Sequence, residues 1–173
     1  ADITAIPSPR IGYTGALNRK VDFSLFLALA RRRSTWHLVL IGRVGDVAPA
    51  EAAALDQLRS CPNVHFVGFK DRETLPAYMA AMDVNVMAYR LGDDVWTEGI
   101  SPLKLHEYLA VGQPVVSADI PAVRPFADVI RIAADPADWE LAVVEALDGR
   151  ATGTTTSRRE RARLNSWDAR VAQ

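Results

Sequence analysis

The segment Trp36-His37-Leu38-Val39-Leu40-Ile41 decides the fold class of this chain. Every residue after His37 is aliphatic, so the segment lacks the polar alternation of a strand with one face in water. It therefore predicts a strand that is buried on both faces, as in a parallel sheet with helices on each side.

Short β-rich segments alternate with helical segments along the rest of the chain. The other predicted strands are 11–13, 64–67, 84–88, 114–117 and 129–132, and the predicted helices are 18–33, 49–60, 71–82, 101–112, 136–147 and 158–173. Parallel strands joined by short helical crossovers form right-handed β-α-β units. We therefore predict a single Rossmann-like, doubly wound α/β domain with about six parallel strands and helices on both faces.

The composition excludes several classes of protein. The 173 residues suit one domain, and 49% hydrophobic with 24% charged residues is a globular composition, not a disordered one. A net charge of −1 argues against nucleic acid as the main partner. The single cysteine, Cys61, excludes an internal disulfide and fits a reducing compartment. No apolar run approaches the ~20 residues that span a bilayer.

The lysines gather at one predicted edge of the sheet. Ligands of open parallel sheets bind outside the carboxyl ends of the strands. The chain has 17 arginines but only three lysines, and all three follow predicted strands at that edge, where two arginines join them: Lys20, Lys70, Lys104, Arg19 and Arg43. Because strand-to-helix loops are generally polar, this pattern fits either an anion site or ordinary solvated loops.

The helix predicted to begin with Ser101 as N-cap and Pro102 at its first position carries a cation near its start. A capping box would place glutamate at the third helical position, where this chain has Lys104. A cation there costs up to about 1 kcal/mol unless an anion accompanies it, and a phosphate would bind both the free amides and the ammonium. Glu107 lies one turn on, on the same side, and could accept hydrogen bonds from two neighbouring hydroxyls. The alternative is a plain surface Lys–Glu pair.

The stretch 101–116, SPLKLHEYLAVGQPVV, resembles the donor-site signature PLKxxEYLAxGxPVV of family 4 glycosyltransferases of the GT-B fold. Three other parts resemble the same family: GYTGAL at 12–17, NVHFVG at 63–68 followed by LPAY at 75–78, and NSWDARV at 165–171. The resemblance covers nearly the whole chain. It implies a hexosyltransferase-like enzyme that retains configuration and uses a UDP- or GDP-linked sugar in polysaccharide, glycolipid or glycoconjugate synthesis.

The resemblance also implies roles for individual residues. Lys104 together with Arg19 or Lys20 would hold the donor diphosphate, and Glu107 would bind the ribose hydroxyls. The other implied donor contacts are Phe69 and Lys70 against the base, Gly15 and Arg43 in the loops after the first two strands, Glu98, and the backbone from Gly99 through Ile100, Ser101 and Pro102 to Leu103. Cationic groups would stabilise the leaving diphosphate, so we expect neither a metal nor another cofactor.

One position departs from the family pattern. The family often has a glutamate that contacts the sugar eight positions before the equivalent of Glu107, and here that position is Gly99. Glu98 lies nine positions before. Either the loop shifts to present Glu98, or backbone amides replace the carboxylate. We favour the amides.

The resemblance predicts a division of the chain into a nucleotide-sugar domain, residues 1–151, and a linker with a terminal helix, residues 152–173. The terminal helix would pack toward a missing N-terminal acceptor domain. The chain begins without methionine, so we expect a piece of a longer protein that binds nucleotide weakly and transfers little or nothing alone. We expect a cytoplasmic location, with any contact to the inner face of the membrane made peripherally through the missing domain.

Other functions receive less support from the residues. His37, His65 and His106 are scattered and lack the spacing of metal ligands. The segment Gly12-Tyr13-Thr14-Gly15 is not the GxGxxG of nicotinamide enzymes. The unusual position of Glu98 leaves open a non-catalytic nucleotide-binding module of the same fold. A sugar-nucleotide epimerase ranks lower, because such enzymes lack the PLKxxEY block in this form.

Overall fold

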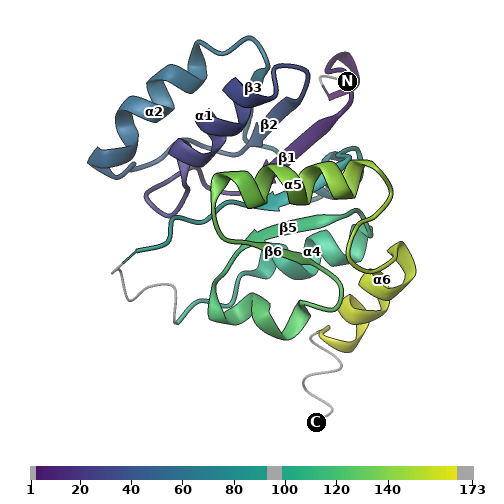
Figure 1. Ribbon diagram of the computed structural model, residues 1–173. Coiled ribbons are helices and arrows are strands. Elements are labelled where there is room, and N and C mark those ends of the chain that lie inside the picture. Colours follow the sequence, from purple (N-terminus) through teal and green to yellow (C-terminus); the bar gives the residue numbers. More distant parts are fainter. Residues whose placement is uncertain (1–2, 93–98, 167–173) are drawn as a thin grey trace.

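The fold is a six-stranded parallel sheet with the order β3-β2-β1-β4-β5-β6 (Figure 1). The computed structural model describes residues 3–92 and 99–166. The strands are β1 (Arg10–Thr14), β2 (His37–Ile41), β3 (Val64–Gly68), β4 (Val84–Met87), β5 (Val115–Ala118) and β6 (Arg131–Ala133). This is the doubly wound order, in which the chain reverses direction across the sheet between β1 and β4. The predicted fold class is confirmed.

The helices form one layer on each face of the sheet. They are α1 (Phe23–Arg32), α2 (Pro49–Arg59), α3 (Leu75–Ala80), α4 (Leu103–Val111), α5 (Pro136–Leu147) and α6 (Thr155–Leu164), with short 3₁₀ helices at Ile3–Ala5 and Pro121–Phe126. Helix α1 contacts α2 and α5, whereas α4 contacts α3 and α6. The layer of α3, α4 and α6 therefore lies on the face opposite to α1, α2 and α5 (Figure 1).

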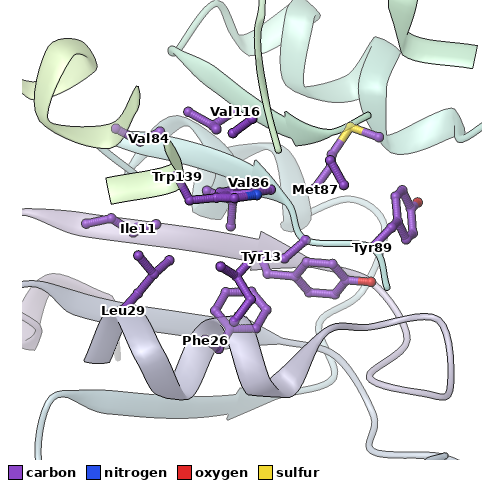
Figure 2. Packing of buried hydrophobic residues seen from close by; sticks show 14 of the residues in the cluster. Ile11, Tyr13, Phe26, Leu29, Val84, Val86, Met87, Tyr89, Val116 and Trp139 are labelled. Atoms are coloured by element: carbon purple, nitrogen blue, oxygen red, sulfur yellow. The ribbon is translucent and has the colours of Figure 1, made fainter. Parts of the chain in front are cut away.

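Burial of the central strands agrees with the prediction from the sequence. In β2 the four residues after His37 are buried, as are all four residues of β4 and of β5. Side chains of β1 and β4 meet those of α1 and α5 in the main core, where the Tyr13 and Phe26 rings pack edge to face at 6.0 Å (Figure 2). Continuous apolar runs are what a sheet covered on both faces requires.

The predicted helix 18–33 is too long at its start. Helix α1 begins at Phe23, because the Asp22 side chain caps it by accepting a hydrogen bond from the Leu25 N–H at 2.7 Å. Residues before the cap form bridges in the loops instead, and one of these pairs Val21 with Tyr89. The apolar periodicity before Asp22 reflects loop packing rather than a helical turn.

Three further boundaries differ from the prediction. Helix α3 begins after Thr74 instead of Asp71, and the Asp71 carbonyl accepts hydrogen bonds from the N–H groups of Thr74 and Leu75. Strand β6 starts two residues later than expected. Helix α4 begins at Leu103, so Pro102 is the N-cap and Ser101 is not. Pro102 has an extended ψ of 107°, which excludes it from the helix. Gly112 ends α4 with a φ of 84°, as predicted.

The predicted linker 152–157 contains the start of a helix. The Thr154 side chain accepts a hydrogen bond from the Ser157 N–H, and the Ser157 hydroxyl accepts one from the Thr154 N–H, which forms a capping box. Hydroxyl residues that looked like a flexible linker are therefore helix caps. The helix predicted at 158–173 spans Thr155–Leu164, and residues 167–173 lie outside the described part of the chain.

Helix α6 is attached to the end of α4 by a buried arginine. Arg158 is 3% exposed, and it donates hydrogen bonds to the carbonyls of Gly112 and Thr152 at 3.0 and 2.7 Å. Burial lowers the pKa of its guanidinium, which shows the cost of removing this charge from water. Packing of α6 against α4 thus depends on this hydrogen-bonded charge. The predicted contact of the terminal helix with another domain stays a prediction.

We predict that Arg158→Met lowers the free energy of unfolding by about 2–3 kcal/mol, because the buried Gly112 carbonyl and the part-buried Thr152 carbonyl lose a charged donor. The melting temperature should fall by about 5–10 °C. Hydrogen exchange should rise first in α6 and in the last turn of α4. The matched control is Arg163→Met, the same substitution at an exposed arginine of α6. Equal effects of the two substitutions would contradict the structural role of Arg158.

Candidate functional site

The site begins at the crevice between β1 and β4, where the sheet reverses direction. The two strands pair at Ile11↔Val84 and at Gly12↔Asn85, toward the start of β1. Near its end, the Thr14 N–H donates instead to the Tyr108 hydroxyl of α4, at 2.8 Å. The same hydroxyl makes a long hydrogen bond to the carbonyl of Val86 on β4, at 3.5 Å. Helix α4 therefore fills the crevice, and its buried tyrosine bridges the two strands.

Lys104 lies one helical turn before Tyr108, so both side chains are on the same side of α4. The Lys104 ammonium is 3.8 Å from the centroid of the Tyr13 ring and 5.2 Å from that of Tyr89. A Cβ atom added to Gly15 would lie only 2.8 Å from the Lys104 Nζ atom. The ammonium is thus enclosed by two aromatic faces and a glycine at the carboxyl end of β1.

The environment of Lys104 disfavours its charge. Burial is the main cause that lowers the pKa of Lys104 to about 7; Glu107 opposes this shift, and Lys20 makes a smaller contribution in the same direction as burial. Burial also raises the pKa of Tyr89 to about 12 and holds the pKa of Tyr13 well above its ordinary value. Both rings are therefore neutral near pH 7. A bound anion next to Lys104 would stabilise its protonated form.

The N-terminus of α4 is the second part of a candidate anion site. Asp22 and Asp135 cap α1 and α5 with their carboxylates. For α4, no side chain of the described residues makes such a cap, and no acidic residue lies in the first turn. The positive end of this helix dipole and the Lys104 ammonium, at the second helical position, therefore lie together.

The structure distinguishes the two cations that follow β1. Arg19 is exposed and forms an ion pair with Asp46. Lys20 interacts electrostatically with Lys104, and its carbonyl accepts a hydrogen bond from the Arg90 N–H in the segment after β4. Of the two candidates, Lys20 is the partner that the loop brings toward Lys104, while Arg19 is directed to Asp46.

A pocket of about 250 Å³ lies at the carboxyl ends of β1, β2 and β3. Two of its lining residues, Gly15 and Gly42, approach through their backbones, because Gly42 has a φ of 149° and a Cβ there would lie 1.9 Å from the carbonyl oxygen of Gly15. Four of the predicted donor contacts line this pocket: Gly15, Arg43, Phe69 and Lys70. The structure therefore brings together predicted residues that are up to 55 positions apart in the sequence.

Two cations that line this pocket lie against aromatic rings. The Arg43 guanidinium lies 4.5 Å from the centroid of the Phe69 ring, and Phe69 is 55% exposed. The Lys70 ammonium lies 5.1 Å from the Tyr78 ring. An exposed ring that carries a guanidinium is suited to stacking with a flat heterocycle.

Other predicted residues lie around α4 but line different cavities. Glu107 and Leu103 line a groove of about 470 Å³ between α4 and α6, together with Arg72, Arg159 and Arg163. Ser101 and Pro102 line a third cavity of about 420 Å³ beside the 3₁₀ helix Pro121–Phe126. The remaining predicted positions are Ile100, which packs against the main core, Gly99, where an added Cβ would meet only open space, and Glu98, which lies outside the described residues.

Two other kinds of site are absent from the described part of the chain. Residues 3–92 and 99–166 contain no cluster of three or more histidine, cysteine, aspartate or glutamate side chains that could hold a metal ion. His37 and His65 approach each other to 2.9 Å, but they form a pair at the opposite end of the strands. None of the described helices is long and apolar enough to cross a membrane.

Comparison with known proteins identifies the family. The model of the family described as "Glycosyl transferases group 1" matches residues 8–148. The chain belongs to the group 1 glycosyl transferases. A relative is TuaH of Bacillus subtilis (strain 168), which is named as a candidate teichuronic acid biosynthesis glycosyltransferase. It is 27% identical to this group 1 domain over 168 residues, which cover 94% of this chain and 41% of the relative.

Solved structures show the same fold. Sucrose-phosphate synthase from Thermosynechococcus elongatus is 21% identical with a TM-score of 0.73, and the match covers 96% of this chain and 44% of that one. HepE of Anabaena, solved in complex with UDP-glucose, is 19% identical with a TM-score of 0.67, covering 93% of this chain and 45% of that one. The fold is that of a Rossmann-like domain of a GT-B glycosyltransferase. The chain spans less than half the length of each of these three relatives.

The sequence did not reveal the aromatic part of the site. Tyr13 and Tyr89 come from the ends of different strands, and only the fold places them against Lys104. The bridging role of Tyr108 was also missed, although its spacing of four from Lys104 put the two on one side of a helix. A signal in the sequence existed at Tyr13, since it is a large ring with a polar tip at the end of the predicted strand 11–13, whose other residues are Ile11 and Gly12.

We predict that Lys104→Met stabilises the chain by about 1–2 kcal/mol at neutral pH, because it removes a charge that burial disfavours. The folded-state pKa of Lys104, about 7, is below its unfolded value, so the unfolded chain binds more protons between these values. The free energy of unfolding of the unmutated chain therefore rises with pH above 7. The advantage of Lys104→Met should be largest below pH 7 and should shrink at higher pH.

Thermal unfolding at a series of pH values measures this effect. The control is Arg59→Met, an exposed cation in the last turn of α2 at the other edge of the sheet. A stability difference between Lys104→Met and the unmutated chain that stays constant with pH would contradict a lowered pKa for Lys104.

Proposed function

We propose that this domain binds the nucleoside-diphosphate sugar of a glycosyltransferase, with the diphosphate at Lys104 and the N-terminus of α4. The observation that carries the proposal is the ammonium of Lys104, enclosed at a helix end that is already positive. An enclosed cation at this end of a helix is destabilising unless an anion binds next to it. A diphosphate supplies the charge and enough oxygen atoms for both the amides and the ammonium.

The rest of the donor fits the cavities around this point. The pocket lined by Arg43 and Phe69 would receive the base, since an exposed aromatic ring offers a stacking surface. Lys20 would join Lys104 at the diphosphate. Glu107, exposed on α4, would accept the ribose hydroxyls. The UDP-glucose complex of HepE, which has this fold, supports a UDP-sugar as the first probe.

The proposed chemistry is departure of the nucleoside diphosphate from the anomeric carbon of the sugar. Lys104 and Lys20 would stabilise the negative charge that develops on the leaving oxygen, and the α4 amides would add partial positive charge. The acceptor hydroxyl would come from a substrate held by the remaining half of the full-length protein. We place the chain in family 4, with retention of configuration and no need for a metal, and we expect the isolated domain to bind donor without transfer.

Binding of UDP and GDP, followed by isothermal titration calorimetry, tests the donor site. Lys104→Ala should weaken UDP binding by about thirtyfold or more, since a charge-assisted contact is lost. Glu107→Ala should weaken it by about fivefold to thirtyfold. Arg59→Ala, which removes an exposed cation at the opposite edge of the sheet, should leave the affinity unchanged. Absence of binding at millimolar nucleotide, or binding indifferent to Lys104 and Glu107, would overturn the proposal.

The affinity for UDP-glucose should fall as the pH rises above 7. The anion prefers protonated Lys104, so binding raises a pKa that is about 7 in the free domain and takes up a proton. The affinity should decrease by up to about tenfold per pH unit until the pKa of the bound state is reached. UDP-glucose suits this test better than UDP, whose terminal phosphate titrates near pH 6. Lys104→Arg, which stays charged over this pH range, should remove the pH dependence of the affinity. If the affinity of the unmutated chain for UDP-glucose does not change with pH, the proposed role of Lys104 is contradicted.

A further inference from the structure

The Lys104 side chain is held by two tyrosine rings from separate parts of the sheet. Tyr13 is the penultimate residue of β1, and Tyr89 follows β4 on the other side of the crevice (Figure 2). Their ring centroids are 3.8 and 5.2 Å from the Lys104 ammonium, within the range of cation–π attraction. A lysine normally loses this attraction to water, but here the ammonium is largely removed from solvent, where the interaction is stronger.

Both tyrosines also have contacts other than Lys104. The Tyr13 ring packs edge to face with Phe26 and donates a hydrogen bond from its hydroxyl to the Ala16 carbonyl. Tyr89 is 7% exposed, and its backbone forms a bridge with Val21 of the loop after β1. The two tyrosines are therefore packed into the domain, and each presents its ring to the flexible Lys104 side chain.

We propose that Tyr13 and Tyr89 are positioning residues that hold the Lys104 ammonium in place before the donor diphosphate arrives. This inference rests on the proposed donor site at Lys104. A free lysine side chain has many rotamers, and a ligand that binds it must restrict them. Rings that restrict those rotamers in the unbound domain remove part of this entropic cost from the binding step.

The position of Gly15 indicates that the two rings hold the Lys104 ammonium where the proposed ligand would bind it, and not away from that ligand. The Lys104 Nζ atom lies against the backbone of Gly15, 2.8 Å from where a Cβ would stand. Gly15 also lines the pocket that Arg43 and Phe69 form. The held ammonium is therefore already at the border between the α4 N-terminus and that pocket. The groups that act on it there are Lys20, Glu107 and the two rings.

The test compares Tyr89→Leu, which removes the ring, with Tyr89→Phe, which keeps it and loses only the hydroxyl. Tyr89 is chosen because Tyr13 is also part of the core. Tyr89→Leu should weaken binding of UDP and of UDP-glucose by about fivefold to thirtyfold, and Tyr89→Phe should bind nearly as the unmutated chain. In Lys104→Met, which has no ammonium for the ring to hold, Tyr89→Leu should have no further effect.

Nuclear magnetic resonance gives a readout that requires no nucleotide. The chain has only three lysines, so Lys104→Met assigns the Lys104 side-chain methylene signals directly. These signals should be shifted upfield by the ring currents of the two tyrosines. The shift should shrink in Tyr89→Leu and persist in Tyr89→Phe, while the backbone spectrum far from the site remains unchanged.

Each outcome decides between the hypotheses. Equal or tighter UDP binding by Tyr89→Leu would overturn the positioning role, because the rings would then be neutral or would compete with the ligand. Equal losses in Tyr89→Leu and Tyr89→Phe would assign the effect to the hydroxyl and also overturn it. If the unmutated chain binds neither UDP nor GDP, the proposed function fails and the role toward a diphosphate fails with it. The ring-current shift would then still report whether the tyrosines hold Lys104.

Discussion

The Tyr108 hydroxyl, which bridges β1 and β4 from the adjacent helix, is the contact on which the arrangement of the site depends. A doubly wound sheet opens where its strand order reverses, and the backbone groups exposed there need partners. Tyr108 satisfies the Thr14 N–H and reaches the Val86 carbonyl, so α4 is held in the crevice by a hydrogen bond as well as by packing. Because Lys104 is one turn away on the same helix, the bridge also positions the Lys104 ammonium relative to the ends of β1 and β4.

The placement of Lys104 lowers the stability of the free domain but suits the proposed binding of an anion. Burial lowers the pKa of Lys104, and the neighbouring Lys20 adds to the effect, so the free domain holds a charge in an unfavourable place. A structure selected for stability alone would put an apolar side chain at this position. The aromatic rings of Tyr13 and Tyr89 reduce the cost without neutralising the charge. The positive charge therefore remains available to an anion that enters from solvent.

The sequence predicted the parts of this molecule that depend on local pattern. The apolar run after His37 predicted a buried parallel strand, and Gly112 predicted the end of α4, because both follow from the chemistry of neighbouring residues. Helix starts were less accurate. The sequence favours Ser101 as the cap, but the chain enters α4 through an extended Pro102, which local propensity does not predict. The threonines near Thr154 fit both a linker and a capping box, and only packing of α6 on α4 decides between them.

In the candidate site, too, the sequence predicts features that depend on neighbouring residues but not contacts between distant ones. The gathering of lysines and arginines at one sheet edge could be predicted, because parallel strands all end there. What the sequence could not show was which cation pairs with which group: Arg19 pairs with Asp46, Arg43 lies on Phe69, and Lys104 lies on Tyr13. These pairings join the ends of different strands, so they depend on strand order and register. The motif therefore identifies Lys104 as a candidate ligand for phosphate, whereas the aromatic rings that contact its ammonium come from other parts of the chain.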